Sequence, residues 1–330
     1  MANYKGIKGV KTQSLASDPT AADTVGKLWY NTAGYALKYS AEGDGAWAAG
    51  GNMNMPYVAS TCCFGTQSAG MAATGYRAPS PVPSQVNAET YNGTAWTEVN
   101  NVNNGRYGGG GSGTLTAGVI YGGVDNAAGS TWGKWTEEYD GTSFTEVNLM
   151  NGARQYFMSS TSTTVPTAFA VCGTPPIGTL METYDGTSWS EVGNANTATQ
   201  GGAGAGTNAS GLKVAGSVSS CESWNGTSWT EAAANIGEAH GTQTSGCGAS
   251  NTSAMCYGGT PYSGLTETWN GSTWTAVADM ATPTGGRTGI GTTGSALAGG
   301  GWGPTTGPTS NGETEEWSDP VYSIKTVTVS

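Results

Sequence analysis

One ten-residue stretch sets the pattern of this chain: Glu89-Thr90-Tyr91-Asn92-Gly93-Thr94-Ala95-Trp96-Thr97-Glu98. Close copies follow four more times, with their turn glycines at Gly141, Gly186, Gly226 and Gly271. The glycines are therefore 48, 45, 40 and 45 residues apart. A repeat of about 40–50 residues is the length of one four-stranded propeller blade, so the spacing predicts a repeat architecture.

The repeated stretch has the pattern of a β-hairpin. Asn-Gly and Asp-Gly tolerate positive φ and close tight turns, and the flanking residues alternate as strands do. A turn of two or four residues would put Tyr91 and Trp96 on one face, and we favour four because it places them directly opposite. The positions that define the repeat are Trp47, Tyr91, Gly93, Trp96, Tyr139, Gly141, Phe144, Tyr184, Gly186, Trp189, Trp224, Gly226, Trp229, Trp269, Gly271, Trp274 and Trp317.

Incomplete copies flank the five clear ones. Leu37-Lys38-Tyr39 with Gly45-Ala46-Trp47 precedes them, and Glu315-Glu316-Trp317 follows. Seven marks enclose six intervals, so the sequence predicts an all-β, six-bladed propeller over residues 37–330. Its predicted blades are 51–99, 100–147, 148–192, 193–232, 233–277 and 278–319, with 45–50 as the closing strand. Ala46-Trp47-Ala48 should complete the last blade beside the strand of Trp317, which would remove an exposed sheet edge.

Residues 1–36 are predicted to form an N-terminal arm outside the repeat. Residues 1–26 show no sustained period and carry Lys5, Lys8 and Lys11, which indicates an extended docking segment. Two aromatic strands around Asn31-Thr-Ala-Gly34 then predict a hairpin. Residues 321–330 alternate like a further strand, for which the sequence names no partner.

Composition limits the classes of partner. The net charge of −11 argues against binding nucleic acid through its phosphates. No apolar run is long enough for a membrane span, so we expect no membrane insertion. The six cysteines lie in predicted strands without metal-ligand spacing, and we expect free thiols, with a Cys247–Cys256 bridge as the alternative.

Neither a catalytic site nor a metal or cofactor site is predicted. His240 is the only histidine, and no Ser/His/Asp set stands out. His240 takes the place that Arg106, Arg154 and Arg287 occupy at the start of their inner strands, where they could satisfy carbonyls or bind an anion at one mouth of the channel. Five glutamates share another repeat position, which indicates a structural hydrogen-bonding role: Glu89, Glu138, Glu182, Glu222 and Glu267.

The glycine pair, followed by Tyr or Trp and a second aromatic residue, resembles kelch repeats. Tyr121-Gly122-Gly123 and Tyr257-Gly258-Gly259 match best, whereas Ala215-Gly216-Ser217 has lost the pair. Together with Gly26-Lys-Leu-Trp-Tyr-Asn31, the repeats look like kelch-like virion proteins of marine bacteriophages. That resemblance implies a kelch-like propeller and a tail-fibre-like or other exposed structural protein, located in a virion made in the host cytoplasm.

The function expected from this resemblance is non-enzymatic. The chain would dock onto other virion proteins through its N-terminal arm, in a symmetric oligomer, and present the propeller to a host-surface glycan or protein. Two alternatives stay open: a capsid- or neck-decorating protein without receptor binding, and a carbohydrate-binding or glycan-active propeller unconnected with a virion.

Overall fold

The computed structural model describes residues 12–24, 26–42, 45–55, 59–77, 84–125, 131–161, 167–214, 216, 218–238, 240–303, 312–319 and 322–327. They belong to two compact units, each treated by itself. The propeller unit is Ala46–Ser318, and the terminal unit combines Met1–Gly45 with Asp319–Ser330. Within the described residues, the helical content is one short 3-10 turn, η1 (Ala22–Thr24).

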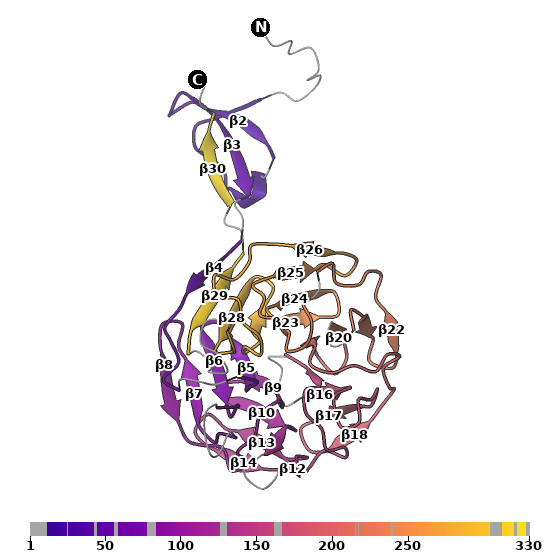
Figure 1. Ribbon diagram of the computed structural model, residues 1–330. Helices are drawn as coiled ribbons and strands as arrows, with labels where there is room; N and C mark the ends of the chain where they lie inside the picture. Colours follow the sequence, from indigo (N-terminus) through magenta and orange to yellow (C-terminus); the bar gives the residue numbers. More distant parts are fainter. Residues whose placement is uncertain are drawn as a thin grey trace. The chain divides into compact units, whose positions relative to one another are not determined.

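The described part of the propeller unit contains six four-stranded antiparallel sheets, here called blades 1 to 6 (Figure 1). Blade 1 comprises β5 (Cys62–Thr66), β6 (Ala69–Ala73), β7 (Ala88–Tyr91) and β8 (Trp96–Val99). Blade 2 comprises β9 (Gly110–Thr114), β10 (Ala117–Tyr121), β13 (Thr136–Tyr139) and β14 (Phe144–Glu146). Blade 3 comprises β15 (Met158–Ser159), β16 (Ala168–Val171), β17 (Met181–Tyr184) and β18 (Trp189–Glu191).

The remaining sheets follow the same plan. Blade 4 comprises β19 (Ala203–Gly206), β20 (Gly211–Val214), β21 (Cys221–Trp224) and β22 (Trp229–Glu231). Blade 5 comprises β23 (Ser245–Ser250), β24 (Ser253–Tyr257), β25 (Thr266–Trp269) and β26 (Trp274–Ala276). Blade 6 comprises β27 (Ile290–Thr292), β28 (Ser295–Gly299), β29 (Thr314–Ser318) and β4 (Ala46–Ala49). A small extra pair, β11 (Val124–Asp125) with β12 (Thr131–Trp132), follows β10.

The aromatic hairpins have the four-residue register that the sequence favoured. Tyr91 lies opposite Trp96, and the same pairing recurs in every blade. The turn is held locally, because the Asn92 side-chain oxygen accepts hydrogen bonds from the backbone N–H groups of Thr94 and Ala95, both at 2.9 Å. The turn glycine Gly93 has a φ of 88°, and its four counterparts have φ between 91° and 98°.

The predicted pairing of the N-terminal strand with the last repeat is confirmed. Trp47 of β4 lies opposite Trp317 of β29, and Ala46 lies opposite Ser318. The Trp47 indole also packs on Tyr257 of blade 5, with ring centroids 5.0 Å apart, and donates a hydrogen bond to Thr266 at 3.0 Å. The fourth strand of blade 6 therefore comes from the opposite end of the chain.

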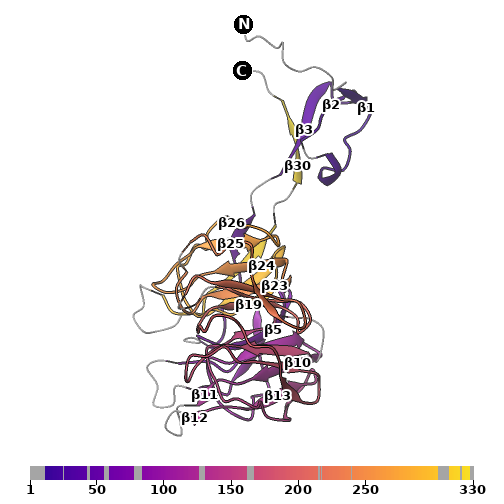
Figure 2. The same cartoon turned by 90° about the vertical axis from the view of Figure 1, so that its right-hand side faces the viewer.

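Inner strands of successive blades lie around a common centre (Figure 1), and Figure 2 shows the same sheets from the side. The contacts run β5–β9–β15–β19–β23–β27 and return from β27 to β5. At this last step Trp96 of blade 1 donates a hydrogen bond to Thr314 of blade 6, at 2.9 Å. The unit thus has an all-β, propeller-like fold.

The terminal unit is a separate four-stranded sheet in the order β1 (Gln13–Leu15), β2 (Leu28–Asn31), β3 (Ala36–Glu42), β30 (Tyr322–Thr326). The predicted hairpin of β2 and β3 is present. The side chain of Asp18 holds one face together, because it accepts hydrogen bonds from Trp29, Asn31 and Lys38.

This sheet changes the predicted domain boundaries. The sequence placed the boundary after residue 36 and read Leu37–Tyr39 as an incomplete blade. The structure instead assigns that segment to β3, whose other edge pairs with the C-terminal strand β30. The predicted extended arm also contains the strand β1, which runs parallel to β2. Lys5, Lys8 and Lys11 lie outside the described residues.

Candidate functional site

Each blade buries one glutamate on its third strand: Glu89, Glu137, Glu182, Glu222, Glu267 and Glu315. Every one of these carboxylates accepts hydrogen bonds from two consecutive backbone N–H groups in the segment before the inner strand of its own blade. The glutamates therefore fix the point at which each blade begins, a structural role like the one predicted.

In blade 2 the predicted residue was wrong by one position. Glu137 is the buried member, whereas Glu138 accepts a hydrogen bond from the Tyr184 hydroxyl at 2.8 Å. Successive strand residues point to opposite faces, so only one of two adjacent glutamates can face the core. The spacing could have shown this, because Glu137 precedes Tyr139 by two residues, as Glu89 precedes Tyr91.

The basic residues predicted at a channel mouth are partners of these glutamates. Four of these contacts are ion pairs, namely Arg106–Glu137, Arg154–Glu182, Lys213–Glu222 and Arg287–Glu315, and His240 takes the corresponding place beside Glu267. All five basic side chains are buried. A buried cation needs a paired carboxylate and further hydrogen bonds, and here it has both. The proposed anion site at a channel mouth is therefore replaced by one internal pair in each of these blades.

Both ring nitrogens of His240 also have partners inside the blade. Its Nδ1 lies 2.9 Å from the Gly258 carbonyl oxygen, and its Nε2 lies 3.2 Å from the Glu267 carboxylate. Lys213, which sequence reasoning missed, pairs with Glu222 from a different strand, β20. The sequence could have revealed it, because Lys213 is the only basic residue in the predicted blade 193–232.

A ring of backbone hydrogen bonds surrounds the centre where the inner strands begin. It passes through Ser60, Gly108, Tyr156, Gly201, Gln243 and Gly286, one residue from each blade. At five of the six steps, an N–H of one member bonds the carbonyl of the preceding member; at the remaining step Thr244, next to Gln243, donates to Gly201. All six residues have left-handed backbone conformations, with φ between 51° and 70°.

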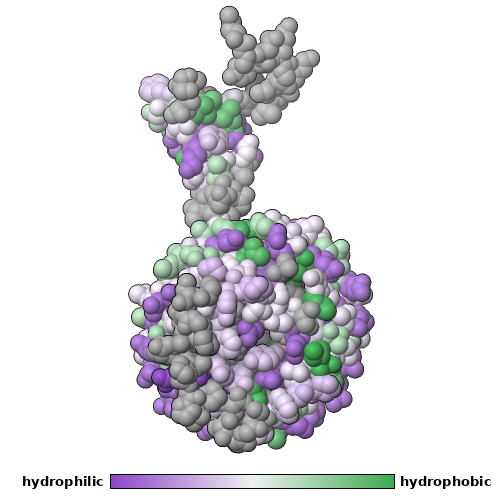
Figure 3. Space-filling view, viewed as in Figure 1, coloured by the Kyte–Doolittle hydropathy of each residue, from purple (hydrophilic) through white to green (hydrophobic). Residues whose placement is uncertain are grey.

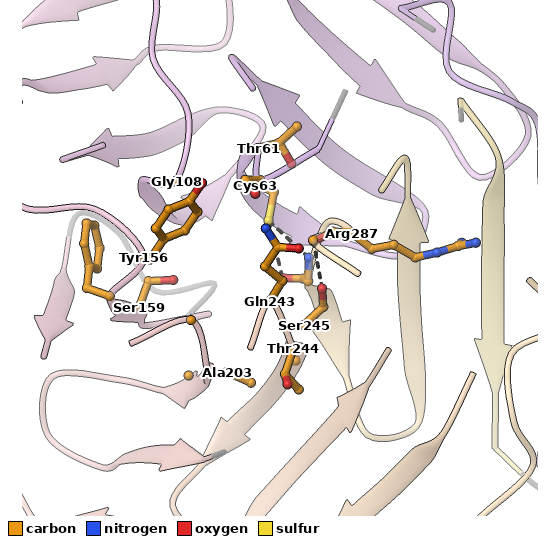
Figure 4. A pocket seen from close by; sticks show the side chains of 18 of the residues that line it. Thr61, Cys63, Gly108, Tyr156, Ser159, Ala203, Gln243, Thr244, Ser245 and Arg287 are labelled. Carbon is orange, nitrogen blue, oxygen red and sulfur yellow. Dashed lines mark hydrogen bonds between the residues drawn. The ribbon is translucent and has the colours of Figure 1, made fainter. Parts of the chain in front are cut away.

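This ring borders a pocket of about 100 Å³, here called the axial pocket (Figure 4). All six blades contribute to its lining. The described side chains around it include Thr61, Tyr156, Ser159 and Gln243. The pocket therefore lies where the ends of six strands converge, a common position for a ligand site in a barrel-like or propeller-like fold.

Among the described lining residues, no charged group faces the axial pocket. Arg287 is the one charged residue among the described lining residues, and Figure 4 shows its side chain extending away from the pocket toward its own blade. Burial raises the pKa of the Cys63 thiol to about 12 and also raises the pKa of Tyr156. Both groups are therefore neutral at pH 7, and the pocket is polar without a net charge.

A row of half-buried aromatic rings leads away from the pocket. The ring centroids of Tyr156 and Tyr107 are 6.3 Å apart, those of Tyr107 and Tyr76 are 5.0 Å apart, and those of Tyr76 and Trp302 are 5.3 Å apart. The row crosses from blade 3 through blades 2 and 1 to blade 6. Much of the visible face of the propeller unit is coloured white to pale purple in Figure 3, which indicates weakly polar residues rather than charged ones.

Three further observations concern the described residues alone. All six cysteines are free thiols, as expected. No group of three or more His, Cys, Asp or Glu side chains in the described ranges is placed to hold a metal ion. Within those same ranges, no helix has the length and apolar character needed to cross a membrane.

The geometry defines a propeller-like protein with an axial pocket, and comparison with known proteins agrees at the level of the fold. The chain is similar to the solved structure of YjhT, with a TM-score of 0.63 and 13% sequence identity over 84% of this chain and 99% of that one. No family model and no curated protein matches the chain. Matches extend to 237 chains of solved structures, so the fold by itself does not select a function.

Proposed function

We propose that this chain is a non-enzymatic structural protein of a bacteriophage particle, an exposed tail fibre, spike or similar appendage. In this proposal the six blades form a closed, kelch-like propeller that binds the host surface, and the terminal unit docks onto other virion proteins in a symmetric oligomer. The virion role in this proposal rests on the resemblance to kelch-like virion proteins. The division of the chain into two units supports the separation of docking from presentation.

Closure of the propeller is supported by two features. The contacts between inner strands return from β27 to β5. The ring of backbone hydrogen bonds does so as well, because Ser60 donates to the Gly286 carbonyl oxygen at 2.8 Å. A propeller closed in this way leaves only short, protected sheet edges, which suits a protein exposed to solvent.

The observation that carries the docking proposal is the route of the chain. The chain enters the propeller unit at Ala46 and leaves it at Ser318, and these two residues lie opposite each other in the register of β4 and β29. Both outer segments of the chain then belong to the terminal unit. Because the segments before and after the propeller unit join in one small unit, we assign attachment to that unit.

The terminal sheet also has an exposed apolar face. Leu28 lies opposite Tyr39, and Tyr30 lies opposite Leu37. Leu28, Tyr30 and Tyr39 are exposed, whereas Trp29 and Asn31 on the other face are buried. Contiguous exposed apolar side chains mark interaction surfaces. We assign this face to the contact with another particle protein.

Antibodies raised against the full chain test the proposal on purified particles. The expected result is labelling at one symmetric location, with a fixed copy number per particle by quantitative mass spectrometry. Absence of the chain from particles would refute the virion role. Labelling on a capsid face or at the neck would favour a decorating protein over an adhesin. Turnover of a glycan by the purified chain would contradict the non-enzymatic assignment.

A further inference from the structure

The ring around the axial pocket alternates between glycine and larger residues. Gly108, Gly201 and Gly286 occupy every second position, and Ser60, Tyr156 and Gln243 occupy the others. A left-handed conformation costs a residue with a Cβ atom more than it costs glycine, and glycine could serve at all six places. Ser60, Tyr156 and Gln243 therefore adopt a conformation that is strained for any residue other than glycine, and all three line the axial pocket. Strain of this kind is concentrated at ligand sites.

Several polar groups in the pocket have no partner within the described residues. The Thr61 side chain is only 8% exposed, yet its buried hydroxyl makes no hydrogen bond there. Among these residues the Tyr156 hydroxyl and the Gln243 amide are also without a hydrogen bond, although Ser245, in the same lining, donates to the Arg287 carbonyl at 2.9 Å. The Thr61 hydroxyl lies beneath the pocket surface, whereas Tyr156 and Gln243 are half-buried, so a bound ligand can reach the hydroxyl and the amide of these two residues.

The chemistry of these groups selects the ligand. A hydroxyl and an amide can each donate and accept, so together they suit adjacent hydroxyl groups. The Tyr156 ring offers an apolar surface next to them. Among the described lining residues, no cation faces the pocket to pair with an anion and no carboxylate faces it to pair with a cation. A volume of about 100 Å³ holds roughly three waters, which is less than a whole sugar ring, so one edge of the ligand with its adjacent hydroxyl groups enters the pocket.

We propose that the axial pocket binds one edge of a neutral monosaccharide unit, with the Gln243 amide and the Tyr156 hydroxyl hydrogen-bonding its hydroxyl groups and the Tyr156 ring packing against the sugar. The proposal rests on the proposed function only for the source of the sugar, a host-surface glycan. Tyr107, Tyr76 and Trp302 continue from Tyr156, and their rings provide apolar surface for the following units of an oligosaccharide.

Calorimetric titration of the full chain tests the site. The probes are glucose, galactose, mannose and N-acetylglucosamine, with glucuronic acid as the charged counterpart of glucose. At least one neutral sugar is expected to saturate with a millimolar Kd, and its oligosaccharide is expected to bind more tightly. Glucuronic acid should bind at least tenfold more weakly than glucose if glucose is the preferred sugar. Saturation by none of the neutral sugars, or equal binding of glucuronic acid, overturns the proposal.

Two variants separate binding from folding. Gln243→Gly removes the amide and relieves the backbone, so binding should fall at least tenfold while the Tm stays unchanged or rises. Tyr156→Phe removes only the hydroxyl and should weaken binding severalfold. Tyr35 of the terminal unit is also left-handed, with a φ of 49°, and is 83% exposed, so Tyr35→Phe and Tyr35→Gly are matched controls that should leave binding unchanged. Unaltered binding by Gln243→Gly, or loss of binding in a Tyr35 variant, contradicts the assignment.

The outcomes also distinguish this site from the virion role. Sugar binding by a chain that is absent from particles would support the sugar site and refute the virion role. Stoichiometric presence in particles without binding of any probe sugar would refute the pocket alone.

Discussion

The buried ion pair of Lys213 and Glu222 gives the sharpest test of how much these internal pairs stabilise the blades. Lys213 Nζ lies 2.7 Å from Glu222 Oε1, and neither side chain is exposed. The same carboxylate accepts hydrogen bonds from the backbone N–H groups of Asn196 at 2.8 Å and Thr197 at 2.9 Å. Glu222→Gln keeps the shape but leaves a buried ammonium group unpaired and one backbone donor unsatisfied.

The expected cost is large. Removing one partner of a buried ion pair destabilises by about 3–5 kcal/mol. For a unit of this size each kcal/mol lowers the Tm by roughly 2–4 °C, so Glu222→Gln should lower it by about 10 °C. The double variant Lys213→Met/Glu222→Gln buries no charge and should lose less than the sum of the two single variants. Glu231, which lies opposite Glu222 and is exposed, gives the control Glu231→Gln, expected within about 0.5 kcal/mol of the wild type.

The same pair makes a prediction about pH. Burial by itself would raise the pKa of Glu222, but the hydrogen bond and charge of Lys213 and the two backbone donors outweigh it and hold the pKa below its ordinary value of 4.5. The lowered folded-state pKa contributes stability that is fully present above pH 4.5 and is lost as the pH falls through the folded value. The Tm difference between wild type and Glu222→Gln should therefore shrink below pH 4.5. Scanning calorimetry from pH 7 to pH 3 measures it, and equal Tm values for Glu222→Gln and Glu231→Gln at pH 7 would refute the account.

Three further predictions concern the two ends of the chain. Trp47→Ala removes the ring contacts of β4 with Tyr257 and Trp317, and should cost about 2–4 kcal/mol by urea denaturation, whereas Trp132→Ala, at an exposed site, should change little. The hydrogen bond from Lys38, followed by that from Asn31, lowers the pKa of Asp18 to about 2, so hydrogen-exchange protection of β2 and β3 should persist at pH 4 and decline toward pH 2. Asp18→Asn should reduce that protection already at pH 7; undiminished protection would contradict this role. Replacing Tyr30 and Tyr39 with serine should abolish incorporation into particles without changing the Tm of the propeller unit, and normal incorporation would remove this face from the docking proposal.

Local patterns could predict the blades, because the signals that build them are contained within ten residues. The Asn-Gly or Asp-Gly turn fixes its own geometry, and the two aromatic residues identify the register. Pairing of Trp47 with Trp317 was also predictable, since an incomplete first copy and an incomplete last copy complement each other. The strands of each blade accordingly fall within the six predicted ranges, and β4 falls within the predicted closing strand 45–50.

Features that depend on distant partners were harder to predict. The aromatic strand at Leu37–Tyr39 resembles part of a blade, and only its pairing with β30 shows that it belongs elsewhere. The role of Arg106 and Arg154 depended on which carboxylate each would meet inside the blade. The axial pocket depended on backbone conformations at Tyr156 and Gln243 that neither residue type favours. A sequence pattern cannot reveal a strain that the surrounding structure imposes.

The joining of β4 to β29 has a consequence for the order of synthesis. β4 leaves the ribosome before any other strand of the propeller unit, yet its pairing partner is the last of that unit to be made. β30 then follows β29 and completes the terminal sheet. Ribosomes that stop early therefore release chains whose sixth blade and terminal sheet are both unfinished. Because the same final segments complete both units, a chain whose terminal sheet is complete is also one whose propeller unit has been fully synthesised.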